Sequence, residues 1–322
     1  MTANANRIAT EDVVCDYCGE HVPSTIVSRG RDFEYDTCAN DFTFVRCDRC
    51  DLVFLNPRPT VDTLGTIYPP SYEPFHFDEM SSSLIGRARN LMQKRSVGVI
   101  AGLLPQDAVI IDAGCGSGQL LALLQRYGSK SWTLYGNDIS TESLVRIEQR
   151  LGIGTIPGRF EAITTDVRFD MIILNQTIEH LDRPSHVVAK AAELLKPGGV
   201  LFIETPSLDG VDHAIYRRRY WGGYHFPRHW VLFTERTLRR VMTRFGLETV
   251  RVDYLPSPAF WIQSVHHLLA DKGFPRLARF WTIRNPLPLA MATAFDVIAG
   301  KLYRTSNMRL VARKPIAERQ KS

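Results

Sequence analysis

The sequence has no apolar run long enough to cross a membrane. In the C-terminal third, the longest stretches without Asp, Glu, Lys or Arg, such as residues 256–270, fall short of the roughly 20 apolar residues that a spanning helix needs. The first twelve residues are polar and interrupted by charges, so they do not match a signal peptide. We therefore expect no transmembrane span and a cytoplasmic location.

The chain also has little excess charge of either sign. Its 39 basic and 34 acidic residues give a formal net charge of +5, which is too small to indicate a nucleic-acid partner by itself. Local arginine clusters at 217–219 and 236–240 fit a solvated surface as well as an anionic substrate. The length of 322 residues leaves room for one large domain and a small one.

A glycine-rich turn is the most informative feature that is present. Residues 109–113 are an apolar run that contains Asp112, and Gly114, Gly116 and Gly118 follow at alternate positions. This pattern predicts a buried strand and a tight turn that lets a ligand approach the backbone, followed by a helix over 119–127. The dinucleotide-binding fingerprint is absent because its third glycine would fall on Gln119.

A second acid lies at the end of the next apolar segment, residues 132–138. If the two predicted strands are neighbours, Asp138 lies beside the glycine turn and can accept hydrogen bonds from both hydroxyls of a ribose.

Together with two later motifs, residues 169–181 and 194–206, these features resemble the class I S-adenosylmethionine-dependent methyltransferases. The resemblance implies an α/β fold, a Rossmann-like seven-stranded sheet with helices on both faces. It also implies that the glycine loop holds the methionine part of the cofactor and that Asp138 holds the ribose. The expected cofactor-binding residues are Asp112, Gly114, Cys115, Gly116, Gly118, Asp138, Ile139 and Asn175.

Four of the six cysteines form two pairs, Cys15 with Cys18 and Cys47 with Cys50. Two such pairs can build a tetrahedral thiolate site for zinc, and disulfides are disfavoured in a cytoplasmic chain. Reduced cysteines without metal are the alternative, and Cys38 could substitute in a variant of the site.

The N-terminal part resembles a bacterial methyltransferase group that includes the sugar C-methyltransferases of antibiotic pathways. In that group a four-cysteine zinc module precedes the catalytic domain, and a segment matching Tyr68 and Tyr72 lies near the substrate. The resemblance favours a structural role for zinc over nucleic-acid binding.

These motifs divide the chain into a zinc-ribbon-like module at 13–60, a linker and helical lid at 61–104, and the methyltransferase domain at 105–313. We expect an amphipathic helix over 84–99, a helix from Thr234 to Phe245, and strands over 247–254 and 307–313. An insertion at about 256–305 is predicted to form two or three short helices that cover the cleft or make a homodimer contact. A lipid-facing surface is the alternative.

Methyl transfer to a hydroxyl or an acidic carbon needs a base near the acceptor, and histidine suits neutral pH. The candidates are His180, assisted by Glu179, and His225 and His229, which belong to an aromatic loop at residues 216–230. The structural alternatives are a helix-entry role for His180 and packing of the aromatic loop for the other two. The predicted substrate contacts are Tyr68, Tyr72, Trp221 and Tyr224.

The function predicted from the sequence is methyl transfer to an oxygen or carbon of a small molecule, a sugar or other secondary metabolite. Two alternative functions remain: a nucleic-acid or protein methyltransferase targeted by the zinc module, and a non-catalytic scaffold that binds the cofactor. The first is disfavoured because the residues after the fourth strand, Asn175-Gln176-Thr177, lack the motif associated with methylation of base amino groups.

Overall fold

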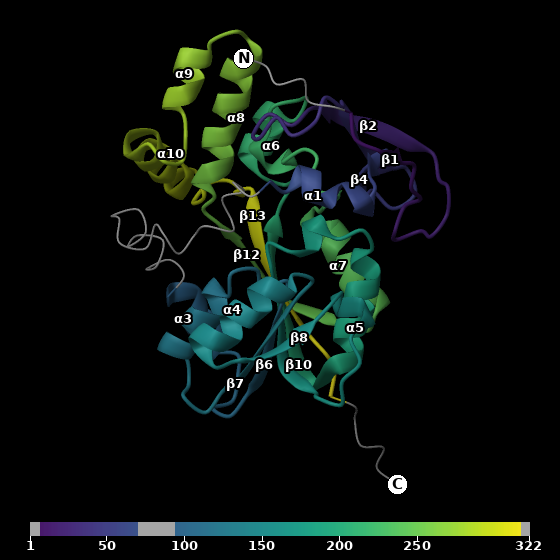
Figure 1. The fold of residues 1–322 in the computed structure, drawn as a ribbon, viewed down its shortest axis with the longest axis vertical. Helices are drawn as coiled ribbons and strands as arrows, with labels where there is room; N and C mark the ends of the chain where they lie inside the picture. The colour runs from purple at the N-terminus through teal and green to yellow at the C-terminus, as the bar shows by residue number, and fades with distance from the viewer. Residues whose placement is uncertain (1–6, 70–93, 317–322) are drawn as a thin grey trace.

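The computed structural model describes residues 7–69 and 94–316, and a seven-stranded sheet forms its centre (Figure 1). In chain order the strands are β6 (Val109–Ala113), β7 (Thr133–Asp138), β8 (Gly154–Pro157), β9 (Phe169–Asn175), β10 (Leu195–Pro206), β12 (Glu248–Leu255) and β13 (Asn307–Arg313). Their spatial order is β12-β13-β10-β9-β6-β7-β8. Only β13 runs antiparallel to its neighbours. The predicted α/β sheet is confirmed.

Helices cover both faces of the sheet. They are α3 (Gln119–Tyr127) and α4 (Thr141–Leu151) on one face, and α5 (Pro184–Leu194) and α7 (Glu235–Arg244) on the other (Figure 1). Successive strand residues point to opposite faces. Along β9, Ile172 therefore joins the core beneath α5 and α7, whereas Ile173 joins the core beneath α3 and α4.

Local sequence signals fix the ends of these helices. Gly128 caps α3, as the sequence predicts, and the Thr234 hydroxyl accepts a hydrogen bond from the amide of Thr237 at the start of α7. Gly246 follows α7 with φ of +71°. Because the parallel strands share one direction, the loops after β6, β7 and β9 meet at the carboxyl edge of the sheet.

The N-terminal module is part of the same body as the large sheet. Its strands β2 (Ser24–Gly30), β3 (Phe42–Cys47) and β4 (Val53–Leu55) form a second sheet with β11 (Val231–Leu232), a segment that follows β10 in the chain. A short ladder joins β1 (Thr10–Glu11) to β5 (Arg58–Pro59). Side chains of the module belong to the core beneath α5 and α7. The domain limits given above stay a prediction, since the two parts share packing.

Shorter helices complete the described chain. They are η1 (Val61–Thr63), α1 (Leu64–Ile67), η3 (Phe160–Ala162), η4 (Ile178–His180), α6 (Val211–Tyr216) and η5 (Gly222–Tyr224). Residues 94–101 are helical, and the rest of the helix expected over 84–99 lies outside the described residues, as does Tyr72.

The segment between β12 and β13 forms α8 (Pro258–Asp271), α9 (Pro275–Phe280) and α10 (Pro286–Ala299). Within residues 7–69 and 94–316, no helix combines the length and the apolarity that crossing a bilayer requires.

A buried ion pair ties the module to the loop after β10. The guanidinium of Arg228 donates to both carboxylate oxygens of Asp32, at 3.1 and 2.9 Å, and both side chains are fully buried. Asp32 also accepts hydrogen bonds from the backbone and hydroxyl of Thr37. Burial alone would raise the pKa of Asp32, but Arg228 and Thr37 outweigh it and lower the pKa to about 2.

This pair predicts a large loss of stability when one partner is removed. Arg228→Met leaves the Asp32 charge buried and should lower the free energy of unfolding by about 3–5 kcal/mol. The exposed pair between Arg251 and Asp253 is the control, and Arg251→Met should cost about 1 kcal/mol or less. Urea denaturation of both variants measures the difference.

The sign of the pH dependence follows from the lowered pKa of Asp32. Its contribution to stability is present above the pKa of an unfolded aspartate, roughly 3.9, and is lost as the pH falls toward about 2. The penalty of Arg228→Met should therefore shrink in acid. An Arg228→Met protein as stable as Arg251→Met at neutral pH would contradict the account.

Candidate active site

The glycine loop between β6 and α3 has backbone angles that glycine adopts without strain. Gly114, Gly116 and Gly118 have φ of +75°, +52° and +75°. A Cβ at Gly114 would lie 2.5 Å from the Cγ2 atom of Thr177, and one at Gly118 would lie 2.7 Å from the Cγ1 atom of Ile147. At Gly116 no described heavy atom lies within 4 Å of that position. The loop is thus packed at both ends and open in the middle.

Asp138 closes the loop from the end of β7. Its Oδ2 accepts from the amide of Gly116 at 3.0 Å, and its Oδ1 accepts from the amide of Ser140 at 2.9 Å. Each carboxylate oxygen has a second lone pair, so both can still accept from ligand hydroxyls. Ile139 follows directly and is 67% exposed, which leaves an apolar surface beside the carboxylate.

Asp112 is a buried carboxyl group whose Oδ1 has no hydrogen-bond partner among the described residues. Burial, and then the nearby charge of Asp138, raise its pKa to about 7. A buried polar group without a partner is costly, so this atom fits a ligand that brings a hydrogen-bond donor or a positive charge.

Two other predicted cofactor-binding residues, Asn175 and Cys115, differ in how far their side chains are exposed. Asn175 ends β9 at the carboxyl edge and is partly exposed. Cys115 is buried, and its Sγ lies 3.1 Å from where a Cβ on Gly136 would stand, so its side chain packs beneath the loop. Only the backbone of Cys115 is placed to line the loop.

Three histidines gather beside this edge of the sheet. The ring centre of His229 lies 4.6 Å from that of His180 and 4.9 Å from that of His225. His180 comes from η4, directly after β9, whereas the other two come from the aromatic loop after β10. We call these three residues and Glu179 the histidine cluster.

Hydrogen bonds to backbone oxygens indicate which nitrogen carries the proton in His180 and in His229. The Nδ1 atom of His180 lies 3.0 Å from the backbone oxygen of Arg228, and that of His229 lies 2.8 Å from the backbone oxygen of Gly223. A carbonyl oxygen can only accept, so each Nδ1 carries the hydrogen. In the neutral rings the Nε2 atoms are then unprotonated and able to take up a proton.

Tyr68 and Glu34 contact the cluster from the N-terminal part of the chain. The hydroxyl of Tyr68 lies 3.0 Å from Nδ1 of His180. The Nδ1 atom of His225 lies 2.7 Å from Oε1 of Glu34. Burial opposes ionisation of Glu34, but His225, His267 and Arg228 outweigh it and lower the pKa of this carboxyl. The negative charge of Glu34 therefore orients and supports His225.

Burial is the main cause of the pKa shifts of Glu179, His180 and His229. It raises the pKa of Glu179 to about 8 and lowers that of His180 to about 3. For His229, burial and then His180 and His225 move the pKa well below the ordinary value. Glu179 accepts from the hydroxyl of Thr205 at one oxygen, while the other has no partner among the described groups. Near neutral pH the two histidines are uncharged and Glu179 is largely protonated.

The same side chains could hold a cation. One ligand atom each from Glu179, His180 and His229 lie within 4.8 Å of one another. Two imidazoles and a carboxylate are a donor set that divalent transition metals accept.

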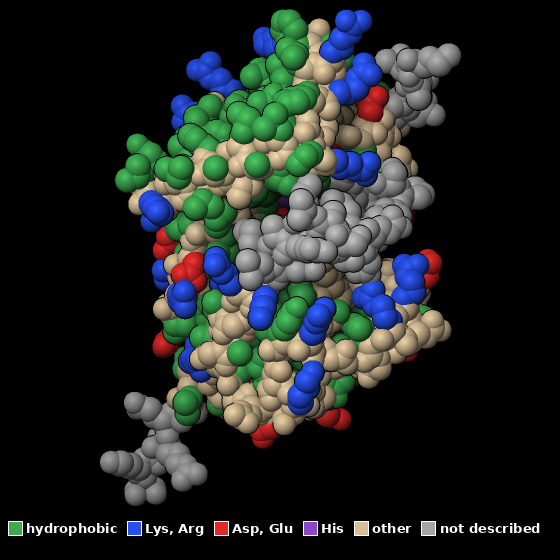
Figure 2. All heavy atoms as spheres, turned by 90° about the vertical axis from the view of Figure 1, so that its left-hand side faces the viewer, with side chains coloured by type: hydrophobic (Ala, Val, Ile, Leu, Met, Phe, Trp, Pro, Cys, Tyr) green, Lys and Arg blue, Asp and Glu red, His purple; other side chains and the backbone are tan. Residues whose placement is uncertain are grey.

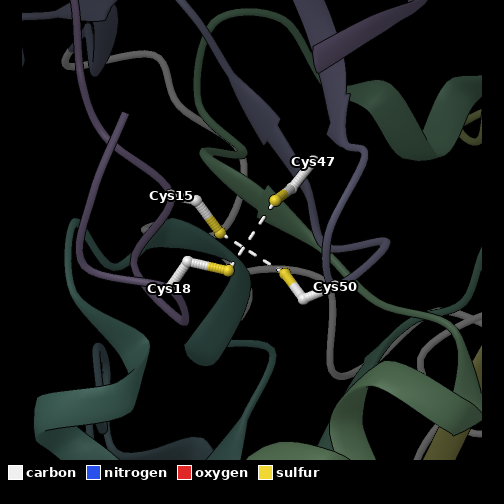
Figure 3. Close-up of side chains that lie close together, drawn as sticks. All are labelled: Cys15, Cys18, Cys47 and Cys50. Carbon is white, nitrogen blue, oxygen red and sulfur yellow. Dashed lines mark hydrogen bonds between the residues drawn. The ribbon is translucent and has the colours of Figure 1, made fainter. Parts of the chain in front are cut away.

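The four paired cysteines converge on one point (Figure 3). The Sγ atoms of Cys15 and Cys50 are 3.5 Å apart, and those of Cys18 and Cys47 are 3.8 Å apart. A tetrahedron of sulfurs at 2.3 Å from zinc has edges of roughly 3.8 Å. The spacing therefore suits a tetrahedral metal site.

The predicted substrate contacts Trp221 and Tyr224 are each only 1% exposed. The indole Nε1 of Trp221 donates to Asp212, and the ring of Tyr224 stacks on Phe44 of the module. The role of these two residues as substrate contacts stays a prediction. The aromatic residues of this loop hold it against the module.

Sequence reasoning missed three residues at the site, Asp32, Glu34 and Arg228. The two acids lie in a module segment with no recognisable motif, about 190 residues away in the chain from the histidines and arginine that they contact. Only the fold brings these groups together.

Comparison with known sequences shows which protein family this chain resembles. A family model described as a methyltransferase domain matches residues 86–252. Among curated proteins, a ubiquinone biosynthesis O-methyltransferase of Coxiella burnetii is 35% identical over 103 residues, which are 30% of this chain and 42% of the relative. One from Caulobacter vibrioides is 32% identical over 104 residues, 31% of this chain and 41% of the relative. The chain thus matches less than half the length of these relatives.

Solved structures with a similar arrangement include a methyltransferase of Archaeoglobus fulgidus, with a TM-score of 0.48 and 14% identity over 76% of this chain and all of that one. Another is the 1,6-didemethyltoxoflavin-N1-methyltransferase of Burkholderia thailandensis, with a TM-score of 0.46 and 16% identity over 85% of this chain and 96% of that one. The family match covers more than half of the 322 residues, and on that ground the chain belongs to the methyltransferase-domain family.

Proposed function

We propose that the chain transfers a methyl group from S-adenosylmethionine to an oxygen or carbon of a small molecule, a sugar or other secondary metabolite. The observation that carries the proposal is the open glycine loop between Asp112 and Asp138, with the histidine cluster on neighbouring loops at the same edge of the sheet. The family match supports the reaction class.

The residues fit this cofactor group by group. Asp138 would accept from the ribose hydroxyls, and the unpaired Oδ1 of Asp112 would meet the amino group of the methionine part. Ile139 offers apolar surface to the adenine, and Asn175 lies at the same edge. When bound, the sulfonium supplies an electrophilic methyl group.

The histidine cluster would take the proton that the acceptor loses. We assign the general base to Nε2 of His180, whose Nδ1–H is held by the backbone oxygen of Arg228. The acceptor's O–H or C–H proton passes to this nitrogen, and the freed electron pair forms the new bond to the methyl carbon. The carboxyl group of Glu179 lies beside this ring and, in its ionised form, would stabilise the imidazolium that results. His225, paired with Glu34, and His229 are substrate contacts or substitutes for the base.

Two findings bear on the acceptor. The curated relatives are named for O-methylation in ubiquinone biosynthesis, which supports a small-molecule acceptor at modest identity. Tyr68 contacts His180, which supports the substrate role that the N-terminal resemblance assigns to this residue. The sugar class rests on that resemblance alone.

We further propose that Cys15, Cys18, Cys47 and Cys50 bind one zinc ion with a structural role. The supporting observations are the sulfur spacing and the place of three of these cysteines in a core shared with the large sheet. A site embedded in that core favours holding the module in place over recruiting a nucleic acid or protein.

Cofactor binding gives the first test of this function. S-adenosylmethionine and S-adenosylhomocysteine should bind once per chain in calorimetry, and Asp138→Ala should weaken binding by about 1.5–3 kcal/mol. Asp253→Ala, at an exposed pair on β12, is the matched control and should bind normally. Binding of NADH without S-adenosylhomocysteine would refute the assignment.

The metal site has its own test. One zinc per chain should copurify, and serine at any of the four clustered positions should remove it and lower folding stability. Cys38→Ser and Cys115→Ser are the controls and should keep the metal. Zinc retained by both Cys15→Ser and Cys47→Ser would rule out the site.

The base assignment is tested by turnover with an acceptor. His180→Ala should lower turnover by roughly 10²–10⁴-fold while leaving cofactor affinity nearly unchanged. His186→Ala, on the exposed side of α5, should behave as wild type. Normal turnover in His180→Ala with a collapse in His225→Ala would move the base to the Glu34–His225 pair.

A further inference from the structure

The insertion between β12 and β13 exposes an unusual number of large apolar side chains. They are between 43% and 77% exposed and lie on α9, α10 and the adjoining turns: Phe274, Leu277, Phe280, Leu287, Met291, Phe295, Val297, Ile298, Leu302 and Tyr303. We call these ten residues the insertion patch. Figure 2 shows hydrophobic side chains gathered over the upper part of that face of the molecule.

The helix α10 turns its larger apolar residues outward. Leu287, Met291, Phe295 and Ile298 recur at intervals of three or four and share one exposed face, at whose edge the ring of Phe295 contacts that of Trp261 in α8. The buried face carries mostly small residues, Pro288, Ala292 and Ala299, together with Asp296. Asp296 accepts hydrogen bonds from the indole of Trp261 and the amide of Ser257 in and before α8. The helix is therefore anchored by one face and presents the other as a ready contact surface.

The exposed charged side chains within residues 272–304 have one sign. Residues 272–304 contain six Lys and Arg, all exposed: Lys272, Arg276, Arg279, Arg284, Lys301 and Arg304. The only acid in that range is Asp296, which is 1% exposed. In Figure 2, blue side chains border the hydrophobic area. Arg304 pairs with Asp209 and Glu235, which lie outside this range. An apolar face bordered by the other five exposed cations is complementary to anionic head groups above an apolar layer.

We propose that the insertion patch docks on an anionic lipid bilayer, with α9 and α10 lying in the plane of the head groups. A second copy of the chain is the less favourable partner. In a two-fold dimer through this patch, the Lys and Arg side chains of residues 272–301 on the two copies would approach each other, and the only acid in that range, Asp296, is buried. A lipid surface satisfies the apolar residues and the cations together. Docking of this kind needs neither the methyl donor nor an acceptor.

Vesicle flotation of the full chain, without cofactor, tests the proposal. The protein should float with vesicles of phosphatidylcholine mixed with phosphatidylglycerol, and bind much less to phosphatidylcholine alone. Raising the salt concentration should release part of the bound protein because it screens the cations. Failure to float with the mixed vesicles would overturn the proposal.

Variants separate the apolar and charged contributions. Leu287→Gln, Met291→Gln and Ile298→Gln combined should abolish flotation, and their exposure means that thermal unfolding should change little. Arg276→Glu with Arg279→Glu should weaken binding to mixed vesicles about tenfold or more. The matched controls are Val145→Gln with Val250→Gln, exposed apolar residues outside the insertion, and Arg126→Glu with Lys130→Glu on the α3 side. Controls that lose binding as strongly as the patch variants would contradict a specific docking face.

Sedimentation tests whether the insertion patch instead binds a second copy of the chain. The wild-type chain should be a monomer whether or not the insertion patch is altered. A wild-type dimer that the triple glutamine variant converts to monomer, together with no flotation of the wild type, would assign the patch to self-association instead.

Discussion

The buried pair between Asp32 and Arg228 is the constraint on which the arrangement of the site depends. Two charges without exposure are tolerable only because the guanidinium meets both carboxylate oxygens, which also accept hydrogen bonds from Thr37 and from the amides of Glu34 and Tyr35. The pair fixes the loop that carries His225 and His229 against the N-terminal module. The backbone oxygen of Arg228 also receives the Nδ1–H of His180. One interaction therefore positions residues from three distant segments.

Desolvation then sets the chemistry of the cluster that this pair organises. The buried imidazole of His180 stays neutral, and the buried carboxyl of Glu179 holds its proton near neutral pH. A charge introduced there by a ligand or a departing proton is screened weakly and has strong effects on its neighbours. The module contributes through Glu34 and Tyr68, so the cluster is built by both parts of the chain.

Features encoded by local patterns were predictable from the sequence. The apolar run ending at Asp112 and the alternate glycines specify the loop, and Thr234 and Gly246 specify the limits of α7. Features that depend on distant contacts were not. Nothing near Asp32 or Glu34 indicates partners in the aromatic loop, and aromatic content alone does not indicate that Trp221 and Tyr224 are almost fully buried. The exposure of the apolar face of α10 could not be predicted from the sequence either, because its periodicity fits a buried helix as well as an exposed one.

The central claim is that the glycine loop and the histidine cluster form one active site. A crystal structure of the chain with S-adenosylhomocysteine tests it most directly. The account predicts that Asp138 accepts hydrogen bonds from the ribose and that the sulfur atom faces the cluster of Glu179, His180 and His229. A ligand bound away from Asp138, or a sulfur atom directed away from that cluster, would contradict it.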